Sequence, residues 1–291
     1  MQLFDLNRPR FKGNTHTHST VSDGRLAPEA VMEIYRAAGY DFLTLTDHRK
    51  QNAETEYRGM KVYSGTELDY SFDNQVVHMT AFAMNAPLDT EKACLSPEDG
   101  IAAITAAGGL TILAHPYWSL NTPDMLKRLD GICAMEIYNT QSGSPWNADR
   151  ADSAAFCDLA FTNGYLTGLI AADDAHYYAG EDCKSYIVVN ADANTREALQ
   201  EAILAGRYYA SRGPEFKQVT IEGRTVRVEC SPADKVIFYS NAVWTRERTI
   251  AGDGLTDVVH ECQNNEEWLR IEIVDKNGMK AYTNPVRLPV E

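Results

Sequence analysis

The sequence Asn14-Thr-His-Thr-His-Ser-Thr-Val-Ser-Asp-Gly24 sets the pattern that the rest of the chain follows. In an extended strand, His16 and His18 project from the same face, because successive side chains alternate. Both imidazoles can therefore reach one metal ion, while Thr17 points away. Asp23 follows in a turn that is marked by Asp-Gly. A single His-x-His pair is equally typical of a polar strand end, so the metal interpretation depends on further ligands from later segments.

The composition is typical of a folded protein with a sizeable core. The chain has 291 residues, of which 44% are hydrophobic and 10% aromatic. Its 27 Lys and Arg residues against 41 Asp and Glu residues give a net charge of -14. This charge argues against non-specific binding to nucleic acid or to an anionic membrane. A phosphorylated substrate remains compatible, because bound divalent cations invert the local field.

Neither targeting nor disulfide signals are evident. The first ten residues lack the apolar run of a signal peptide, and no stretch reaches the roughly 18 apolar residues of a membrane span. The six cysteines are scattered without Cys-x-x-Cys spacing, which favours reduced thiols over a disulfide framework. We therefore expect a cytoplasmic protein.

Short apolar strands alternate with helical segments over the first two thirds of the chain. Helices are expected at residues 28–39, 97–107, 123–129, 147–163 and 195–204. Strands are expected at residues 11–14, 40–46, 61–67, 75–82, 110–114, 133–138, 166–172 and 186–189. The alternation predicts an α/β fold with a parallel sheet, and seven or so units predict a closed barrel.

Most of the histidines follow these strands directly. In a β/α barrel the side chains at the carboxyl ends of the strands converge on one rim. The residues expected at that rim are His16, His18, His48, Glu67, His78, His115, Asp174 and His176.

The pattern changes after Gly213-Pro214. Alternating segments at residues 217–221, 225–229, 235–239 and 268–274 are separated by turn residues, with little helix between them. They predict a small antiparallel β-sandwich, immunoglobulin-like in size. We therefore divide the chain into residues 1–213 and 214–291, and expect the two parts to pack together because no long linker joins them.

Histidines and carboxylates in one cluster favour a metal centre. Imidazole and carboxylate groups suit Zn, Mn or Fe, and a carboxylate can bridge two ions. Close cations lower the pKa of a bridging water and bind the oxygens of a phosphoryl or acyl centre. Such a site needs no nucleophilic Ser or Cys, and we find no convincing Gly-x-Ser-x-Gly or catalytic-Cys setting.

The ordered motifs resemble those of the PHP (polymerase and histidinol phosphatase) superfamily. The matching positions are His16-x-His18, Asp23-Gly24, Thr46-Asp-His48, Glu67, His78, Ala114-His-Pro116 and Asp174-Ala-His176. The resemblance covers about residues 11–214 and keeps the order of the family. It implies a distorted TIM-like (β/α)7 barrel with a hydrolytic centre of two or three divalent metal ions, usually acting on phosphoesters.

The same resemblance implies three groups of ligands. The first ion is held by His16, His18, Glu67 and Asp174. Glu67 bridges to a second ion, which is held by His78 and His115. A possible third position is surrounded by Asp23, His48 and His176. Several relatives have His where this chain has Asp23, so two firmly held ions, with His48 and His176 in a catalytic role, are an alternative.

Further candidates have weaker patterns. Arg49, Lys184 and Arg212 could bind a substrate phosphate or carboxylate, although for each a solvated surface charge is the favoured interpretation. Asn139 and Tyr117 could line the substrate pocket, or serve in structure alone.

Two more residues belong with these candidates. Asp173 is expected to orient a metal ligand or to face outward. His260 has no partner motif, so we expect no function for it.

The function predicted first is a metal-dependent phosphoesterase. A metal-bridged hydroxide would hydrolyse a small phosphorylated metabolite or nucleotide, and His48, His176 or Asp174 would handle protons. Polymeric nucleic acid is disfavoured by the acidic charge. The alternatives are a metallohydrolase acting on a carbamate, ester or amide, and a non-enzymatic scaffold that is stabilised by metal.

Overall fold

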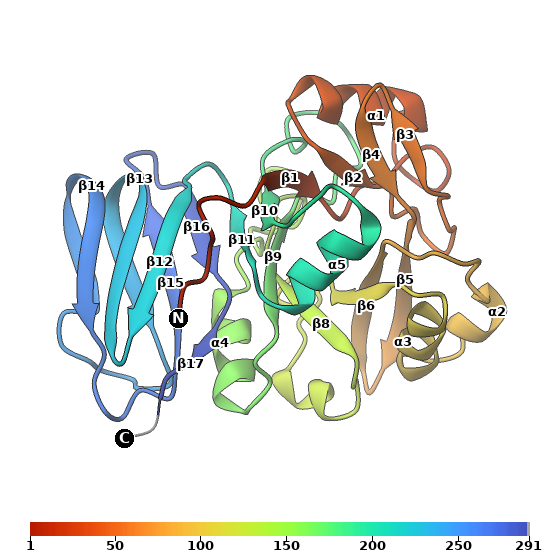
Figure 1. Cartoon of the computed structure of the whole chain (residues 1–291). Coiled ribbons are helices and arrows are strands. Elements are labelled where there is room, and N and C mark those ends of the chain that lie inside the picture. The colour runs from red at the N-terminus through yellow and green to blue at the C-terminus, as the bar shows by residue number, and fades with distance from the viewer. Residues whose placement is uncertain (290–291) are drawn as a thin grey trace.

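The computed structural model describes residues 1–289, and Figure 1 shows their arrangement. The helices are α1 (Pro28–Ala37), α2 (Thr90–Ala93), α3 (Pro97–Ala106), α4 (Ala154–Thr162), α5 (Arg196–Leu204) and the 3-10 helix η1 (Pro123–Lys127). The first strands are β1 (Arg10–Asn14), β2 (Phe42–Thr44), β3 (Thr55–Tyr57), β4 (Met60–Tyr63), β5 (Gly65–Phe72), β6 (Gln75–Phe82), β7 (Leu110–Leu113), β8 (Ile132–Asn139) and β9 (Gly168–Ala172). The later strands are β10 (Tyr186–Asn190), β11 (Tyr208–Ser211), β12 (Phe216–Glu222), β13 (Thr225–Tyr239), β14 (Thr249–Glu261), β15 (Trp268–Val274), β16 (Lys280–Thr283) and β17 (Val286–Arg287).

The long helices begin and end where their terminal residues predict. Pro28 occupies the first turn of α1, and Gly39 follows its end with a φ of 76°, which glycine adopts without strain. The Ser96 hydroxyl accepts a hydrogen bond from the Asp99 amide at the start of α3, and Thr195 caps α5 in the same way. These three helices are confirmed to within a few residues.

The predicted helix at residues 147–163 is wrong in its first half. Only α4 is helical, because the preceding segment bonds to the strand and loop beside it. The Arg150 amide donates to the Ser142 carbonyl, and the Asn147 side chain donates to the Gln141 carbonyl. The segment at 123–129 is likewise a short 3-10 helix.

The α/β class is confirmed, but a closed barrel is not. Among residues 1–289, main-chain pairing gives one sheet in the order β5-β6-β7-β8-β9 and a second, 12-stranded sheet that contains β1, β2 and β4. Parallel pairs occur as expected at β1–β2, β2–β4, β7–β8 and β8–β9. The β5–β6 hairpin is antiparallel, as are its contact with β7 and the pair β1–β10. These antiparallel insertions interrupt the regular strand-helix repeat on which the barrel prediction rested.

Isolated bridges connect segments that follow inner strands of the 12-stranded sheet to the outer strand β5 of the five-stranded sheet and to the segment after its other outer strand, β9. Thr17 pairs with Ala175, and His48 pairs with Glu67, both in parallel. At one end of the strands, the segment after β1 therefore lies beside the segment after β9, and the segment after β2 lies beside β5. This end carries the predicted rim residues.

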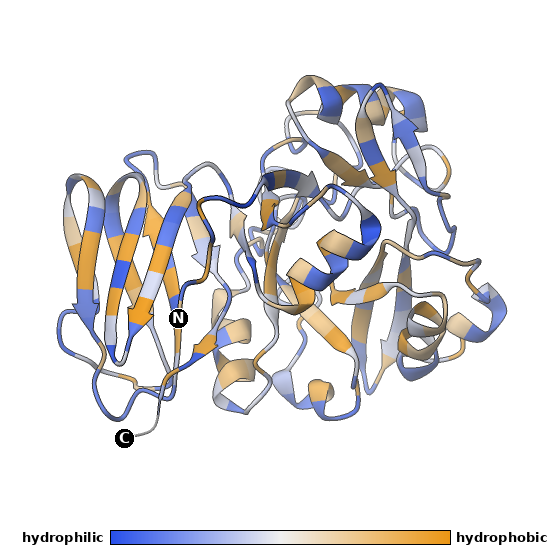
Figure 2. Ribbon diagram, viewed as in Figure 1, coloured by the Kyte–Doolittle hydropathy of each residue, from blue (hydrophilic) through white to orange (hydrophobic). Residues whose placement is uncertain are grey.

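The C-terminal strands are antiparallel, but an explicit two-sheet sandwich is not confirmed. Strands β12 to β16 continue the 12-stranded sheet through the pair β11–β16. The 15-residue strand β13 shifts register between Glu229 and Lys235, so that its first half pairs with β12 and its second half with β15. One bent sheet thus encloses a core of its own, and Figure 2 shows apolar and polar residues alternating along its strands.

The two parts of the chain pack together, as expected. Phe4 is buried in the C-terminal core, and the Leu3 amide donates to the Val219 carbonyl. On the opposite flank, Arg270 of β15 is fully buried and forms an ion pair with Asp158 of α4 at 2.6 Å. Within residues 1–289, no helix is both long and apolar enough to cross a membrane.

Candidate metal centre

The loops after β1 and β9 place four of the predicted ligands together. The Asp174 amide donates to the His16 carbonyl, and the His18 amide donates to the Ala175 carbonyl, so the two loops run side by side. Asp174 has a φ of 56° and His115 a φ of 27°. Non-glycine residues rarely adopt this left-handed region, and such strain is concentrated at functional sites.

Four donor atoms meet at the centre of this end. His16 Nε2 lies 3.2 Å from Glu67 Oε2 and 3.0 Å from Asp174 Oδ1, and His18 Nε2 lies 3.1 Å from each of the same two oxygens. Ligands of a single zinc or manganese ion lie about 3.0–3.4 Å apart, given metal–ligand distances of about 2.0–2.2 Å. The spacing of the four donor atoms therefore fits one shared ion.

The same atoms lack hydrogen-bond partners within the described residues. His16 Nε2, His18 Nε2 and Asp174 Oδ1 are buried and make no hydrogen bond, although carboxylate or imidazole atoms are close by. Buried polar atoms without partners cost free energy. An ion bonded to all of them would remove this cost, so the residues present fit a divalent metal.

Glu136 fixes which nitrogen of His16 faces the cluster. His16 Nδ1 donates to Glu136 Oε1 at 2.7 Å, which leaves the Nε2 lone pair free to bind an ion. Glu136 Oε2 accepts the His115 amide at 2.8 Å and the Asn139 side chain at 2.8 Å. One buried carboxylate thus orients ligands from two different loops.

A second group of donors surrounds the other oxygen of Glu67. His78 Nδ1 lies 2.8 Å from Glu67 Oε1, and His115 Nε2 lies 3.3 Å from it. His115 Nδ1 is 3.0 Å from the Ser119 hydroxyl, which can hold the ring with Nε2 directed inward. The sequence predicts Glu67 at the end of a strand, and this is wrong: Glu67 lies within β5, which continues to Phe72.

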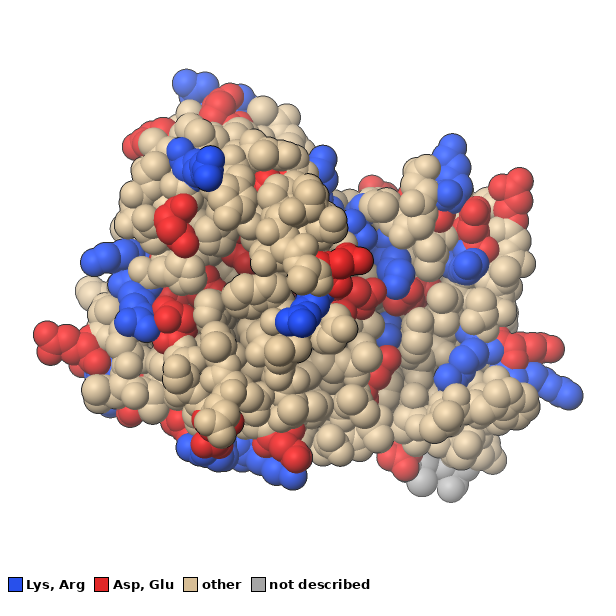
Figure 3. All heavy atoms as spheres, turned by 180° about the vertical axis from the view of Figure 1, so that it is seen from behind, with Lys and Arg blue, Asp and Glu red and all other residues tan. Residues whose placement is uncertain are grey.

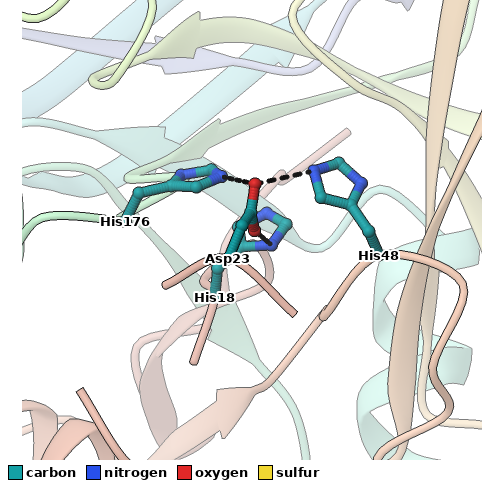
Figure 4. A group of neighbouring side chains, drawn as sticks. All are labelled: His18, Asp23, His48 and His176. Carbon is teal, nitrogen blue, oxygen red and sulfur yellow. Dashed lines mark ion pairs between the residues drawn. The ribbon is translucent and has the colours of Figure 1, made fainter. Parts of the chain in front are cut away.

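Asp23 lies between three imidazoles, as Figure 4 shows. Its carboxylate is 3.6 Å from His18 Nδ1, 3.7 Å from His48 Nε2 and 3.5 Å from His176 Nε2. These distances are longer than those around Glu67, and the Asp23 side chain is 54% exposed. This third group is therefore looser than the other two.

Even without an ion, the charged side chains of the cluster shift one another's pKa. Burial lowers the pKa of His18, but the close negative carboxylates of Asp174 and Glu67 outweigh burial and raise the pKa to about 9. Burial raises the pKa of Glu67, but the neighbouring histidines hold it well below its usual range. The raised pKa values of His16 and His18 indicate that an ion bound there would displace protons from these two imidazoles.

A cavity of about 300 Å³ opens over the cluster. It is lined by Asp23, His48, Glu67, His78, His115, Trp118, Gln141, Ser142, Asn147, Asp174, His176 and Tyr177. Neither Lys nor Arg is among these lining residues. The positive charge needed to bind an anion in this cavity would therefore have to come from bound ions or protonated histidines.

The predicted substrate-binding residues lie elsewhere. Arg49 forms an ion pair with Asp69 at 2.8 Å, and Arg212 lies over the Tyr138 ring at 3.8 Å. The exposed Lys184 contributes its main-chain amide to Asp173. None of the three lines the cavity, so their role in substrate binding stays a prediction.

Neither Asn139 nor Tyr117 is among the residues that line the cavity. Asn139 is buried and donates to Asp174 Oδ2 at 3.2 Å, while Tyr117 is 48% exposed. The neighbouring Trp118 lines the cavity instead of Tyr117.

Buried acids beside the ligands were only partly foreseen. Asp173 is fully buried, and it accepts hydrogen bonds from Asn14, from Tyr35 and from the amides of Cys183, Lys184 and Ser185. It therefore anchors the loop after β9, in line with the orienting role that we considered. The structural role of Glu136 was missed, because only its position three residues before Asn139 marked it in the sequence.

Comparison with known proteins identifies the fold. No family model matches the sequence, and no curated protein matches it. Among solved structures, the chain is similar to a two-domain protein from Bacteroides vulgatus that is described as containing a predicted PHP-like metal-dependent phosphoesterase. The match covers 97% of this chain and 96% of that chain, with a TM-score of 0.54 and 16% identity. The PHP-like resemblance is confirmed at the level of the fold.

Two further solved structures are more distant. One is a putative metal-dependent phosphoesterase from Bifidobacterium adolescentis, with a TM-score of 0.42, 15% identity, and coverage of 56% of this chain and 87% of that chain. The other is an amidohydrolase from Chromobacterium violaceum with bound sulfate and no metal, with a TM-score of 0.45, 15% identity, and coverage of 67% and 96%.

Proposed function

We propose that the protein is a metal-dependent hydrolase that acts on small phosphoesters. The observation that carries this proposal is the meeting of His16 Nε2, His18 Nε2, Glu67 Oε2 and Asp174 Oδ1 at 3.0–3.2 Å without hydrogen bonds between them. The PHP-like fold supports it, and the motifs of the chain resemble those of that superfamily in their order.

The ligand groups follow from the distances. His16, His18, Glu67 and Asp174 would hold the first ion. His78 and His115 would hold a second ion together with Glu67, and Asp23, His48 and His176 would hold a weaker third ion or act on protons. Such ions, when bound, lower the pKa of coordinated water and stabilise the negative charge that develops on substrate oxygens.

His176 is the best placed residue for proton transfer. Its Nδ1 donates to the Asp174 carbonyl at 2.7 Å, so the neutral ring presents an unprotonated Nε2 to the cavity. That nitrogen can accept a proton from the attacking group or, when protonated, donate one to the leaving group. His48 lines the same cavity and is the second candidate for this role.

The cavity and the surface charge favour a small substrate. A volume of about 300 Å³ suits a metabolite or a mononucleotide, and Trp118 and Tyr177 offer aromatic surfaces to an attached ring. On the face shown in Figure 3, acidic and basic residues are interspersed and form no extended basic track for a nucleic acid. The net charge of -14 also disfavours such a polymer.

A second candidate is hydrolysis of a carbamate, ester or amide. It is favoured by the absence of Lys and Arg from the residues that line the cavity, since a neutral carbonyl substrate needs no such charge. The ligand groups would serve the same purpose with a carbonyl carbon in place of phosphorus.

Architecture and location complete the proposal. Residues 1–213 would form a distorted barrel interrupted by the β5–β6 hairpin, and residues 214–291 a β-rich domain to which Phe4 also contributes. We place the protein in the cytoplasm on the composition of its sequence.

The test is a comparison of two substrate panels with protein loaded with Zn, Mn or Fe. Phosphate release from phosphomonoesters and nucleotides, exceeding the hydrolysis of aryl esters and carbamates, is the expected result. Faster hydrolysis of the carbonyl panel would support the second candidate. Absence of both activities in a fully metal-loaded sample would contradict the enzymatic proposal. Hydrolysis by the Glu67→Gln variant at the same rate as by the wild-type protein would also contradict it.

A further inference from the structure

A second group of metal-binding side chains lies in the C-terminal part, on and just after β14. His260 is the penultimate residue of that strand, and Cys262 and Glu266 belong to the turn that leads into β15. The three side chains are buried, with 4%, 6% and 0% exposure. Their ligand atoms all lie within 4.8 Å of one another. These residues are separate from the candidate metal centre, and they adjoin the C-terminal core around Cys262 and Phe238.

Two of the three side chains are incompletely satisfied by the described residues. His260 Nε2 is buried and has no hydrogen-bond partner. The Glu266 carboxylate accepts hydrogen bonds from the Ser240 hydroxyl and from the Gln263 amide, each at 2.7 Å. No Lys or Arg of residues 1–289 forms an ion pair with Glu266, although its carboxylate is fully buried. A buried carboxylate without a cation and a buried imidazole nitrogen without a partner are both unfavourable.

The turn is held in place independently of these side chains. Arg224 donates to the carbonyls of Gln263 at 2.6 Å and Glu266 at 3.1 Å, and the Cys262 amide donates to the Arg224 carbonyl at 3.0 Å. The His260 ring lies flat against Phe238, with ring centres 4.2 Å apart. Contacts of Arg224, Phe238 and the Cys262 amide therefore position the turn and the His260 ring, while the Glu266 carboxylate is held by Ser240 and the Gln263 amide.

We propose that His260, Cys262 and Glu266 bind a structural zinc ion that joins the end of β14 to the turn before β15. Thiolate, imidazole and carboxylate together are a typical zinc donor set, and water or another small ligand would complete the tetrahedron. The ion would neutralise Glu266 and satisfy His260. Burial raises the pKa of the Cys262 thiol to about 12, and a cation bound beside the sulfur would favour the thiolate.

Cobalt substitution tests this proposal, because the candidate metal centre contains no cysteine. A near-ultraviolet sulfur-to-cobalt charge-transfer band can therefore arise only from a site with a thiolate ligand. The full-length wild-type protein, stripped with chelator and titrated with Co²⁺, is expected to develop this band. Glu67→Gln should keep the band, since it alters only the other centre.

Variants assign the band to the proposed residues. Cys262→Ser should abolish it and lower the zinc content by about one ion per chain. The matched control is Cys230→Ser, which removes a thiol of the same core that lies 3.6 Å from the Leu255 carbonyl and outside the cluster. Glu266→Gln should weaken zinc binding while preserving the shape of the side chain.

Two results would overturn the proposal. One is the absence of the band in cobalt-saturated wild-type protein, a measurement that does not depend on the folding of any variant. The other is a band that persists in Cys262→Ser or disappears in Cys230→Ser, since either would place the thiolate elsewhere.

Discussion

Replacing Glu136 by Gln should weaken metal binding without removing any proposed ligand. The Glu136 carboxylate receives three donors, from His16 Nδ1 at 2.7 Å, from the His115 amide at 2.8 Å and from Asn139 at 2.8 Å. Glutamine offers one acceptor oxygen and one NH2 group in the same space, so at least one of these donors would face another donor. The charge that makes His16 a stronger ligand is lost as well.

The magnitude follows from the effect of such supporting carboxylates elsewhere. We expect an affinity loss of about 10-fold to 100-fold, which corresponds to about 1.4–2.7 kcal/mol. The loss should appear for the most tightly bound ion, because His16 faces Glu67 and Asp174. At saturating metal, much of the activity should return, since every ligand of the centre is still present.

Competition with a chromophoric chelator measures this affinity directly. The matched control is Glu272→Gln, another buried glutamate, which contacts Arg270 and Lys280 and no histidine. Wild-type affinity in Glu136→Gln would refute the reasoning. An equal loss in both variants would also refute it, because the effect would then not arise from His16.

Other changes give equally specific expectations. Glu67→Ala or His18→Ala should remove bound metal and activity together while circular dichroism shows a folded chain; full metal occupancy in either variant would contradict the ligand assignment. Arg270→Met should lower the free energy of unfolding by about 3 kcal/mol, since it leaves the partly exposed Asp158 without its cation and the buried Glu272 with Lys280 alone, and an unchanged urea midpoint would argue against this. Asp23→Asn should reduce occupancy of the loosest ion position and spare the others, as measured by elemental analysis; loss of all ions would show that Asp23 holds the whole cluster. Chelation should abolish hydrolysis and readdition of the metal should restore it, whereas activity that survives complete metal removal would exclude the proposed chemistry.

The sequence predicted the cluster better than the architecture around it. The alternation of side chains along an extended segment predicted that His16 and His18 share a face. Asp174 and His176 were placed near them because they directly follow the strand at residues 166–172. Such local patterns require only short-range geometry, so they could be recognised before the fold was known. The helices at residues 28–39, 97–107 and 195–204 were predictable for the same reason.

Long-range pairing was less accessible to sequence analysis. Glu67 lies within β5 because that strand continues into a hairpin, and nothing in the local pattern marks where pairing ends. The irregular segment before α4 has helix-compatible residues, but its contacts with Gln141 and Ser142 override local propensity. The bend of β13, which joins what we expected to be two sheets, likewise depends on tertiary packing.

The residues around the ligands were the hardest to predict. Glu136 lies in an apolar strand with no motif of its own, and its role is visible only through the His16 ring that it orients. Trp118 and Tyr117 are adjacent in sequence, and only the turn after His115 determines that Trp118 lines the cavity.

The central claim is that distant segments share one ion cluster, and anomalous X-ray scattering from a metal-loaded crystal tests it most directly. We predict a strong anomalous peak within bonding distance of His16 Nε2, His18 Nε2, Glu67 Oε2 and Asp174 Oδ1, with a neighbouring peak toward His78 and His115. A metal-loaded crystal without a peak among the first four atoms would contradict the account.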